Sequence, residues 1–356
     1  MGRKKRYNVA VVGATGAVGS EMLRVLEERC FPVATVRLLA SERSAGKRLT
    51  FNGSACRVER LAPRSFNGID LALFSAGATR SLEFAPEAVR RGALVVDNSS
   101  AFRLKADVPL VVPEVNPEAL EAHHGLIANP NCSTIIMVLA LKPLHDAARI
   151  TRIVVSTYQS VSGAGARAMW QLLTETKEAL LKLRVQGSGF RVDAFAKPTA
   201  HSPQPRALPA QIAFNVIPQV DVFLDNRYTR EEMKMVHETR KILSEPDLAI
   251  SATCVRVPVF IAHSEAVWVE TQRPLSPDEA KRLLRRAPGV RVVDDVTKFA
   301  YPLPLEAAGR DEVLVGRIRK DESVAHGLAL WVSGDNLRKG AATNAVQIAE
   351  LVIGKR

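Results

Sequence analysis

A cysteine stands among polar residues at the start of an apolar helical run. Residues 129–134 read NPNCST, and the apolar residues 135–141 follow directly. A cysteine in the first turn of a helix feels the positive end of the helix dipole, which lowers the thiol pKa and favours the nucleophilic thiolate. A single cysteine is more often a small core residue, but polar neighbours on both sides argue against that interpretation. The segment marks Cys132 as a candidate nucleophile.

An arginine and a histidine lie close together further along the chain. Residues 251–265 read SATCVRVPVFIAHSE, which places Arg256 inside an apolar strand pattern and His263 at its end. An unpaired guanidinium in apolar surroundings is costly, so Arg256 requires an anion, either a structural carboxylate or a substrate. His263 is either an acid/base group or a hydrogen-bonded turn residue.

A carboxylate and an ammonium group share one face of a predicted helix. Thr229 and Glu232 form a capping box, which gives Glu232 a structural role. Glu231 and Lys234 lie three residues apart and therefore side by side. They are either a solvated surface ion pair or a pair of opposite charges within a site.

A glycine-rich segment follows the first strand pattern. Residues 13–19 read GATGAVG between an apolar run at 8–12 and a helical run. Such a strand–turn–helix lets a pyrophosphate approach the backbone and the helix N-terminus; the alternative is an ordinary glycine-rich turn. The second strand pattern ends in LASERS (39–44), where Arg43 with Ser41 and Ser44 suits a 2′-phosphate. NADP is therefore favoured over NAD, although Glu42 would repel phosphate if it pointed inward.

Two different sets of elements must position these residues. The first 130 or so residues alternate strands with helices, which predicts a parallel sheet of the nucleotide-binding α/β type. From about residue 150 the pattern indicates an α+β domain with a mostly antiparallel sheet. The predicted strands are 8–12, 35–40, 71–75, 94–97, 110–113, 153–158, 250–257 and 266–271, and the predicted helices are 82–91, 164–184, 230–243 and 341–352.

Composition narrows the class of protein. The 356 residues suggest two domains, and 49 Lys and Arg against 37 Asp and Glu give a formal charge of +12, which points to an anionic partner. Four widely spaced cysteines exclude a zinc ribbon or a disulfide-rich scaffold. The N-terminus shows no secretory signal, and the longest apolar run (135–141) is too short for a membrane span. We expect a cytoplasmic protein without a membrane partner. The basic segment 167–207 has few aromatic residues for base stacking, so no nucleic-acid partner is expected.

Together these motifs resemble the aspartate-semialdehyde dehydrogenase family over essentially the whole chain. The most specific segments are NPNCSTI (129–135), YQSVSGAG (158–165) and CVRVP with AHSE (254–265). Others are GATGAVG (13–19), SERSAGK (41–47), DNSSAFR (97–103), FNVIPQVD (214–221), EEMKMVHETRKIL (231–243) and GDNLRKGAATNA (334–345). The resemblance implies a Rossmann-like NADP-binding domain, of residues 1–131 and 333–356, and a catalytic and dimerisation domain of residues 132–332.

The resemblance also implies roles for individual residues. Cys132 would form the thioester, Gln159 would orient the acyl group and His263 would be the acid/base. Arg256 would hold the substrate α-carboxylate and Glu231 its α-amino group.

Further residues would bind phosphate and cofactor. Arg103 and Lys234 would hold the phosphate, and no metal is expected. The cofactor would be contacted by Gly13, Thr15, Gly16, Ala17, Val18, Gly19, Arg43, Ser44, Ser162, Gly163 and Asn336.

The implied activity is the reversible NADPH-dependent reduction of L-4-aspartyl phosphate to L-aspartate 4-semialdehyde, in lysine, threonine, methionine and diaminopimelate biosynthesis. The expected assembly is a homodimer or a dimer of dimers. Three alternatives stay open. They are a related reductase of N-acetylglutamyl or glyceraldehyde phosphates, a non-catalytic NADP-binding homologue and a basic nucleic-acid-binding protein. An N-acetylated substrate has no α-ammonium for Glu231.

Overall fold

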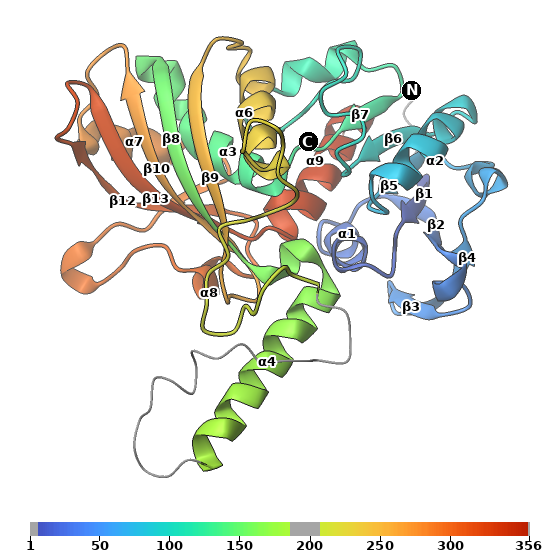
Figure 1. The fold of residues 1–356 in the computed structure, drawn as a ribbon. Coiled ribbons are helices and arrows are strands. Elements are labelled where there is room, and N and C mark those ends of the chain that lie inside the picture. The colour runs from blue at the N-terminus through green and yellow to red at the C-terminus, as the bar shows by residue number, and fades with distance from the viewer. Residues whose placement is uncertain (1–5, 186–206, 355–356) are drawn as a thin grey trace.

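The computed structural model describes residues 6–185 and 207–354, which form two sheets with the helices that cover them (Figure 1). Residues 1–5, 186–206, which include part of the basic segment 167–207, and 355–356 lie outside the described residues. Within the described ranges, no helix combines the length and apolar character needed to cross a membrane.

The first sheet has seven strands in the order β3-β4-β2-β1-β5-β6-β7. All neighbouring pairs are parallel except β3 and β4. Its central strands are buried on both faces, which explains why they read as continuous apolar runs rather than alternating ones. The strands are β1 (Tyr7–Val12), β2 (Val33–Ala40), β3 (Arg48–Phe51), β4 (Ser54–Arg60), β5 (Leu71–Phe74), β6 (Leu94–Asp97) and β7 (Leu126–Ala128).

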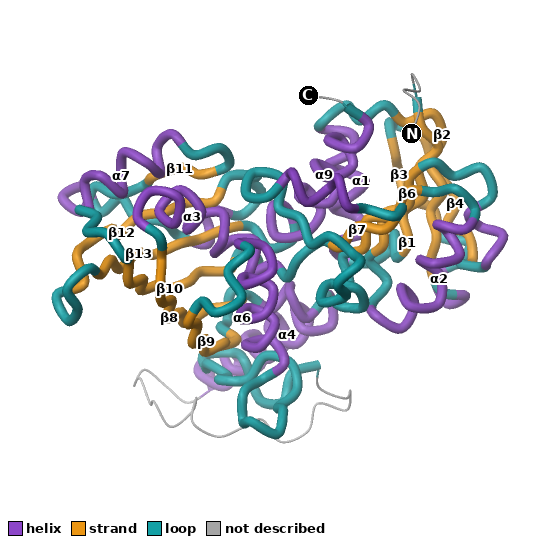
Figure 2. Tube along the Cα trace, turned by 90° about the horizontal axis from the view of Figure 1, so that it is seen from above, coloured by secondary structure: helices purple, strands orange, loops and turns teal. Residues whose placement is uncertain are grey.

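The second sheet has six strands in the order β11-β12-β13-β10-β8-β9 and is mostly antiparallel, as predicted. Figure 2 shows α3, α6 and α7 along one face of this sheet, and contacts of these helices with β9, β10, β12 and β13 agree with that view. The strands are β8 (Ile150–Gln159), β9 (Ala249–Arg256), β10 (His263–Thr271), β11 (Val290–Val292), β12 (Val313–Asp321) and β13 (Gly327–Gly334).

The helices confirm most of the predicted elements. The predicted helix 230–243 is α6, and its capping box forms as expected, with the Thr229 N–H donating to Glu232 Oε2 over 2.6 Å. The α-helices are α1 (Ala17–Glu28), α2 (Ala78–Arg90), α3 (Cys132–Ala148), α4 (Ala166–Val185), α6 (Arg230–Leu243), α7 (Pro277–Arg286), α8 (Pro304–Ala307) and α9 (Thr343–Ile353).

One predicted strand is wrong, and others were missed. Residues 110–113 form only an isolated bridge, between Leu110 and Ala128, and the edge position beside β6 belongs to β7. Pro109 and Pro113 flank the apolar run, and proline cannot donate to a strand ladder. The strands that the sequence did not predict are β3, β4, β7, β11, β12 and β13. β7 and β11 have only three residues each, and β3 and β4 carry exposed, charged residues, so their patterns were weak.

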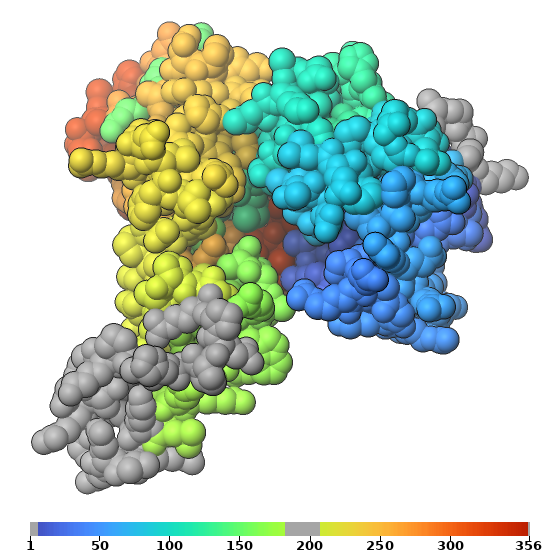
Figure 3. All heavy atoms as spheres, turned by 45° about the vertical axis from the view of Figure 1, so that its right-hand side comes forward, coloured from blue at the N-terminus to red at the C-terminus, as the bar shows by residue number. Residues whose placement is uncertain are grey.

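The end of the chain returns to the first sheet. Helix α9 packs on α1, and five of its residues share a core with β1: Ala345, Val346, Ile348, Ala349 and Ile353. The segment Arg338–Ala342 before it is a single π-helical turn. The space-filling view shows a hollow between the blue-to-cyan N-terminal part and the green-to-yellow part, with red C-terminal atoms at its floor (Figure 3).

Candidate active site

A cavity of about 490 Å³ lies where the two sheets meet, and residues from both halves of the chain line it. Seven residues that the sequence marked for chemistry or substrate line it or touch a residue that does. They are Arg103, Cys132, Gln159, Glu231, Lys234, Arg256 and His263.

Cys132 is the first residue of α3 and lines the cavity. Asn131 caps the helix, with its Oδ1 accepting the backbone N–H groups of Ser133 (3.1 Å) and Thr134 (3.2 Å). A Cβ at Gly340 would lie 2.9 Å from the Cβ of Cys132, so glycine at that position leaves room for the thiol. The polar residues around Cys132 therefore fix the helix end that carries it.

His263 is fully buried, and its Nε2 lies 3.4 Å from the Cys132 Sγ. On the other side of the ring, the backbone N–H of Ser160 donates to Nδ1 over 3.1 Å. Because a backbone N–H can only donate, Nδ1 is the acceptor and we assign the proton of the neutral ring to Nε2. Burial and the nearby Arg256 lower the pKa of His263 well below its usual value. The ring is therefore neutral at pH 7 and presents an N–H toward the thiol.

The thiol pKa differs from the sequence-based expectation. Burial, with a further contribution from Glu231, raises the pKa of Cys132 to about 12. Arg103, Arg256 and the Ser133 N–H at the helix start oppose this rise and are outweighed. The expectation of a lowered pKa is wrong for the protein without ligands, because desolvation of the thiolate exceeds the effect of the helix end.

Gln159 and Arg256 lie beside one another at the ends of β8 and β9, which are paired in register. Gln159 Nε2 donates to Ser133 Oγ over 3.0 Å, and Arg256 Nη1 donates to the Ser160 carbonyl over 2.8 Å. Both side chains are buried. Arg256 lines the cavity, and its Nε is buried and has no hydrogen-bond partner among the described residues.

Glu231 and Lys234 form an ion pair, with Lys234 Nζ 3.1 Å from Glu231 Oε2. Both residues line the cavity, so this is not the solvated surface pair that the sequence left as an alternative. Lys234 also contacts Asp221, over 2.8 Å. Burial would raise the pKa of Glu231, but Lys234 and a 2.8 Å hydrogen bond from Asn131 Nδ2 outweigh it and lower the pKa below its usual range. Glu231 is therefore a buried anion within the site.

Arg103 reaches the same cavity from the first sheet's side of the molecule. Its Nη1 donates to Glu238 over 3.0 Å and its Nη2 to the Asn98 carbonyl over 2.9 Å. Its Nε is buried and, within the part of the chain that the structure describes, has no hydrogen-bond partner. The site thus holds three cations, at Arg103, Lys234 and Arg256.

A second cavity, of about 480 Å³, opens at the carboxyl ends of β1, β2 and β5. Gly13, Thr15, Gly16, Arg43 and Ser44 line it, as expected for cofactor contacts. Gly13 has a φ of +88°, and a Cβ there would lie 2.4 Å from the Ser75 carbonyl oxygen. Gly16 precedes α1 without a side-chain cap, which leaves helix N–H groups available to an anion.

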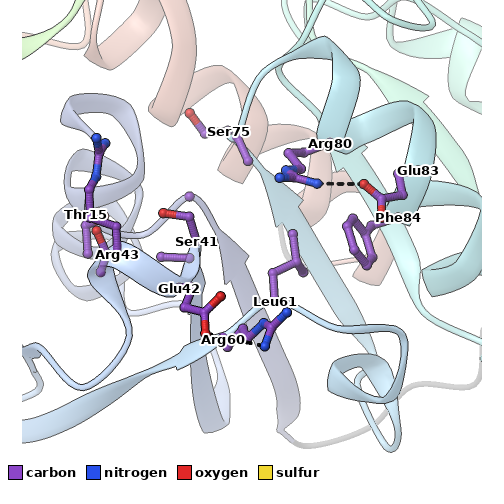
Figure 4. A pocket seen from close by; sticks show the side chains of 15 residues that line it. Thr15, Ser41, Glu42, Arg43, Arg60, Leu61, Ser75, Arg80, Glu83 and Phe84 are labelled. Atoms are coloured by element: carbon purple, nitrogen blue, oxygen red, sulfur yellow. Dashed lines mark hydrogen bonds and ion pairs between the residues drawn. The ribbon is translucent and has the colours of Figure 1, made fainter.

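Three arginines surround the outer part of this second cavity. Arg43 lies on the same side as Thr15, and Arg80 lies on the opposite side, where it pairs with Glu83 (Figure 4). Glu42 does not stand unpaired, because Arg60 contacts it over 3.6 Å. The negative charge that the sequence left as an objection to phosphate binding is thus partly offset.

Of the remaining predicted cofactor residues, some line the cavity that holds Cys132 and others line neither cavity. Val18, Ser162, Gly163 and Asn336 line the cavity that holds Cys132 rather than the second cavity. Asn336 Oδ1 accepts the hydroxyls of Ser160 (3.1 Å) and Ser162 (3.2 Å), behind His263. Ala17 and Gly19 line neither cavity; a Cβ at Gly19 would lie 2.2 Å from the Gly13 oxygen, so Gly19 allows the turn to pack.

Two acidic residues near the site were missed in the sequence. Asp221 lines the cavity and pairs with Lys234, and buried Glu238 pairs with Arg103. Asp221 ends one recognised motif, and Glu238 lies within another. Glu238 follows Glu231 by seven residues, a spacing that places both on one helix face and was the available signal.

Comparisons with known proteins match nearly the whole chain. The family model "Semialdehyde dehydrogenase, NAD binding domain" matches residues 8–123, and "Semialdehyde dehydrogenase, dimerisation domain" matches residues 141–339. Aspartate-semialdehyde dehydrogenase of Aquifex aeolicus is 54% identical over 350 residues, covering 98% of each chain.

Two solved structures are also similar. Aspartate semialdehyde dehydrogenase II of Vibrio cholerae, solved in complex with ASA, has a TM-score of 0.89 and 48% identity and covers 99% of each chain. Aspartate semialdehyde dehydrogenase of Candida albicans, solved with NADP, has a TM-score of 0.73 and 25% identity; the match covers 98% of this chain and 99% of that one.

Proposed function

The chain belongs to the aspartate-semialdehyde dehydrogenase family, and on that premise we propose that it reduces L-4-aspartyl phosphate to L-aspartate 4-semialdehyde with NADPH through a thioester on Cys132. Read in reverse, the reaction oxidises the semialdehyde with NADP and inorganic phosphate. The observation that carries this proposal is the arrangement of charges around Cys132.

The substrate carries three charged groups, and the cavity offers a partner of opposite sign to each. Aspartyl phosphate has an α-carboxylate, an α-ammonium and a phosphate. We assign the α-carboxylate to Arg256, whose buried Nε is a donor without a partner among the described residues. Glu231, held ionised by Lys234, would pair with the α-ammonium. An N-acetylated substrate would leave this buried carboxylate without its partner, which argues against that alternative.

The phosphate would lie between Arg103 and Lys234. Lys234 is bonded to Glu231 and Asp221, so a bound phosphate would compete with these carboxylates for its ammonium group. Arg103 is oriented by its two acceptors and offers its remaining Nε–H. Guanidinium groups suit phosphate because they donate several hydrogen bonds in one plane.

Cys132 and His263 would carry the acyl transfer. The Cys132 sulfur forms a bond to the substrate acyl carbon, the bond to phosphate breaks, and the departing phosphate accounts for the thiol proton as HPO₄²⁻. His263 holds its proton on Nε2, 3.4 Å from Sγ, where it can stabilise or protonate an oxygen that gains negative charge on the carbon bonded to Sγ. Gln159 donates to Ser133 and to Glu231, which fixes its amide beside the reacting group.

The residues of the second cavity fit a dinucleotide. Gly13, whose position admits no side chain, and the uncapped start of α1 would accept the pyrophosphate, and Arg43 with Ser44 would hold a 2′-phosphate. Bound there, NADPH supplies the hydride that reduction of the acyl group requires. Arg60 supports the choice of NADP because it pairs with Glu42, and the NADP bound to the Candida albicans relative also supports it.

We also propose that the protein forms a homodimer and that its chain divides into two domains. A homodimer is supported by the dimerisation-domain model that matches residues 141–339. The division into residues 1–131 with 333–356 and residues 132–332 is supported by α9, which packs in the core of the first sheet.

The test is an assay of NADP reduction by the purified protein with aspartate semialdehyde, with and without inorganic phosphate. We expect phosphate-dependent turnover in the wild type and none in Cys132→Ala. Robust activity in the alanine variant would reject the thioester. Turnover of another aldehyde in place of aspartate semialdehyde would reject the substrate assignment.

A further inference from the structure

Glu238 is a buried carboxylate on α6 that contacts the candidate phosphate site and the nucleophile's helix at once. Its side chain is 1% exposed. Oε1 accepts Nη1 of Arg103 over 3.0 Å, and Oε2 accepts the backbone N–H of Asn131 over 2.6 Å. The two partners lie 135 and 107 residues away in the sequence. One side chain thus joins three separate segments of the chain.

The Asn131 contact holds the start of the helix that carries Cys132. Asn131 caps α3, and its side-chain Nδ2 donates to Glu231 over 2.8 Å. Glu231 and Glu238 are seven residues apart on α6 and therefore lie on one helix face. From that face both accept a hydrogen bond from Asn131, Glu231 from its side chain and Glu238 from its backbone N–H. A change at Glu238 removes a hydrogen bond from the backbone N–H of Asn131, the residue that directly precedes the nucleophile in the chain.

The Arg103 contact fixes the orientation of a guanidinium group that lines the cavity. Glu238 and the Asn98 carbonyl occupy its two terminal nitrogens from different sides, and Nε is the buried donor without a partner in the described residues. Without Glu238, rotation of the side chain could bring any of its donors toward the cavity. With Glu238, the donor offered to an anion is defined.

We propose that Glu238 is a positioning residue that sets the affinity for phosphate by orienting Arg103, and that it links this phosphate site to the Cys132 helix through Asn131. The inference rests on the proposed function, since it takes Arg103 to be a phosphate ligand. Both oxygens accept from N–H groups, and neither partner atom can accept a proton, so the geometry fits the ionised carboxylate. Burial raises the pKa of Glu238, and Arg103 and the Asn131 amide oppose that rise.

Glu238→Gln tests the proposal, because a glutamine has one acceptor oxygen for the two donors. In the direction of semialdehyde oxidation, we expect the KM for phosphate to rise about tenfold, the effect of losing one charge-assisted hydrogen bond, with the KM for NADP within about twofold of wild type. In an Arg103→Ala background, Glu238→Gln should leave the phosphate KM equal to that of Arg103→Ala alone, because the guanidinium group through which Glu238 acts is already absent.

Glu232→Gln is the matched control. Glu232 is a buried carboxylate on the same helix, and like Glu238 it accepts one N–H group on each oxygen. Both of its donors are backbone N–H groups, of Thr229 and Cys254, and neither belongs to a residue that we assign to substrate or phosphate. It should lower thermal stability by a similar amount without raising the phosphate KM.

Three outcomes would overturn the inference. They are a phosphate KM within twofold of wild type in Glu238→Gln, an equal rise in Glu232→Gln, or an undiminished rise in the Arg103→Ala background. If neither Glu238→Gln nor Glu238→Asp folds while Glu232→Gln does, the carboxylate serves stability alone and the proposal is also rejected. Failure of the proposed function is a distinct result, since the wild type would then show no phosphate-dependent turnover.

Discussion

The Cys132 thiol should be unusually slow to react in the enzyme without ligands, and Glu231→Gln should make it faster. Burial and the Glu231 charge together raise the pKa of Cys132 from 9.0 to about 12. Glutamine keeps the shape of Glu231 and can still accept from Asn131, but it removes the negative charge that disfavours the thiolate. The variant therefore isolates the electrostatic part of the effect.

The magnitude follows from the thiolate fraction. At pH 8, a thiol of pKa 12 is ionised in about 1 molecule in 10⁴, whereas one of pKa 9 is ionised in about 1 in 10, so alkylation should be roughly a thousandfold slower. The rate should rise about tenfold per pH unit up to pH 11 without a plateau. In Glu231→Gln it should be higher at each pH, because the variant lacks the negative charge that disfavours the thiolate.

The assay is iodoacetamide labelling followed by mass spectrometry of the peptide that contains Cys132. The exposed Cys30 in the same sample serves as an internal reference for reagent and pH. Glu232→Gln, a change at the next residue, should leave the Cys132 rate unaltered. A plateau for wild-type Cys132 below pH 9, or equal rates in wild type and Glu231→Gln, would refute this account of the thiol.

Three further changes have defined outcomes. Arg43→Ala should raise the KM for NADP at least about tenfold by removing a charge-assisted contact and leave the KM for NAD within twofold; equal losses with both cofactors would contradict the 2′-phosphate assignment. Gly163→Ala places a Cβ 3.3 Å from His263 Nε2 and 3.1 Å from Arg256 Nη1; kcat for semialdehyde oxidation should fall, and an unchanged kcat would contradict this crowding of the two side chains. Arg256→Lys should raise the KM for aspartate semialdehyde by about tenfold or more, since lysine cannot bind a carboxylate in bidentate fashion, and an unchanged KM would exclude Arg256 as its ligand.

Much of the fold was predictable because its elements carry strong local patterns. The central parallel strands are continuous apolar runs. Helix α6 begins at a capping box that Thr229 and Glu232 make recognisable in the sequence. Strand β7 has only three residues, and the apolar segment at 110–113 looked more like a strand than β7 does. Local pattern could not decide between them, because the choice depends on which segment pairs with β6.

The candidate site was predictable as residue types but not as a set of partners. Cys132 stood out through its polar neighbours, and Arg256 through its apolar strand. The elevated thiol pKa could not be read from the sequence, since it depends on desolvation of the thiol in the fold and on a carboxylate 99 positions away, Glu231. Glu238 was missed for the same reason: its partners, Arg103 and Asn131, are neighbours only in the folded chain.

The most direct test of the central claim is capture of the acyl-enzyme. Wild-type protein incubated with aspartate semialdehyde and NADP, without phosphate, should gain the mass of one aspartyl group, located on the Cys132 peptide, and should lose it when phosphate is added. Cys132→Ala should gain no such mass. An adduct on another residue, or full turnover without any adduct, would contradict the thioester mechanism.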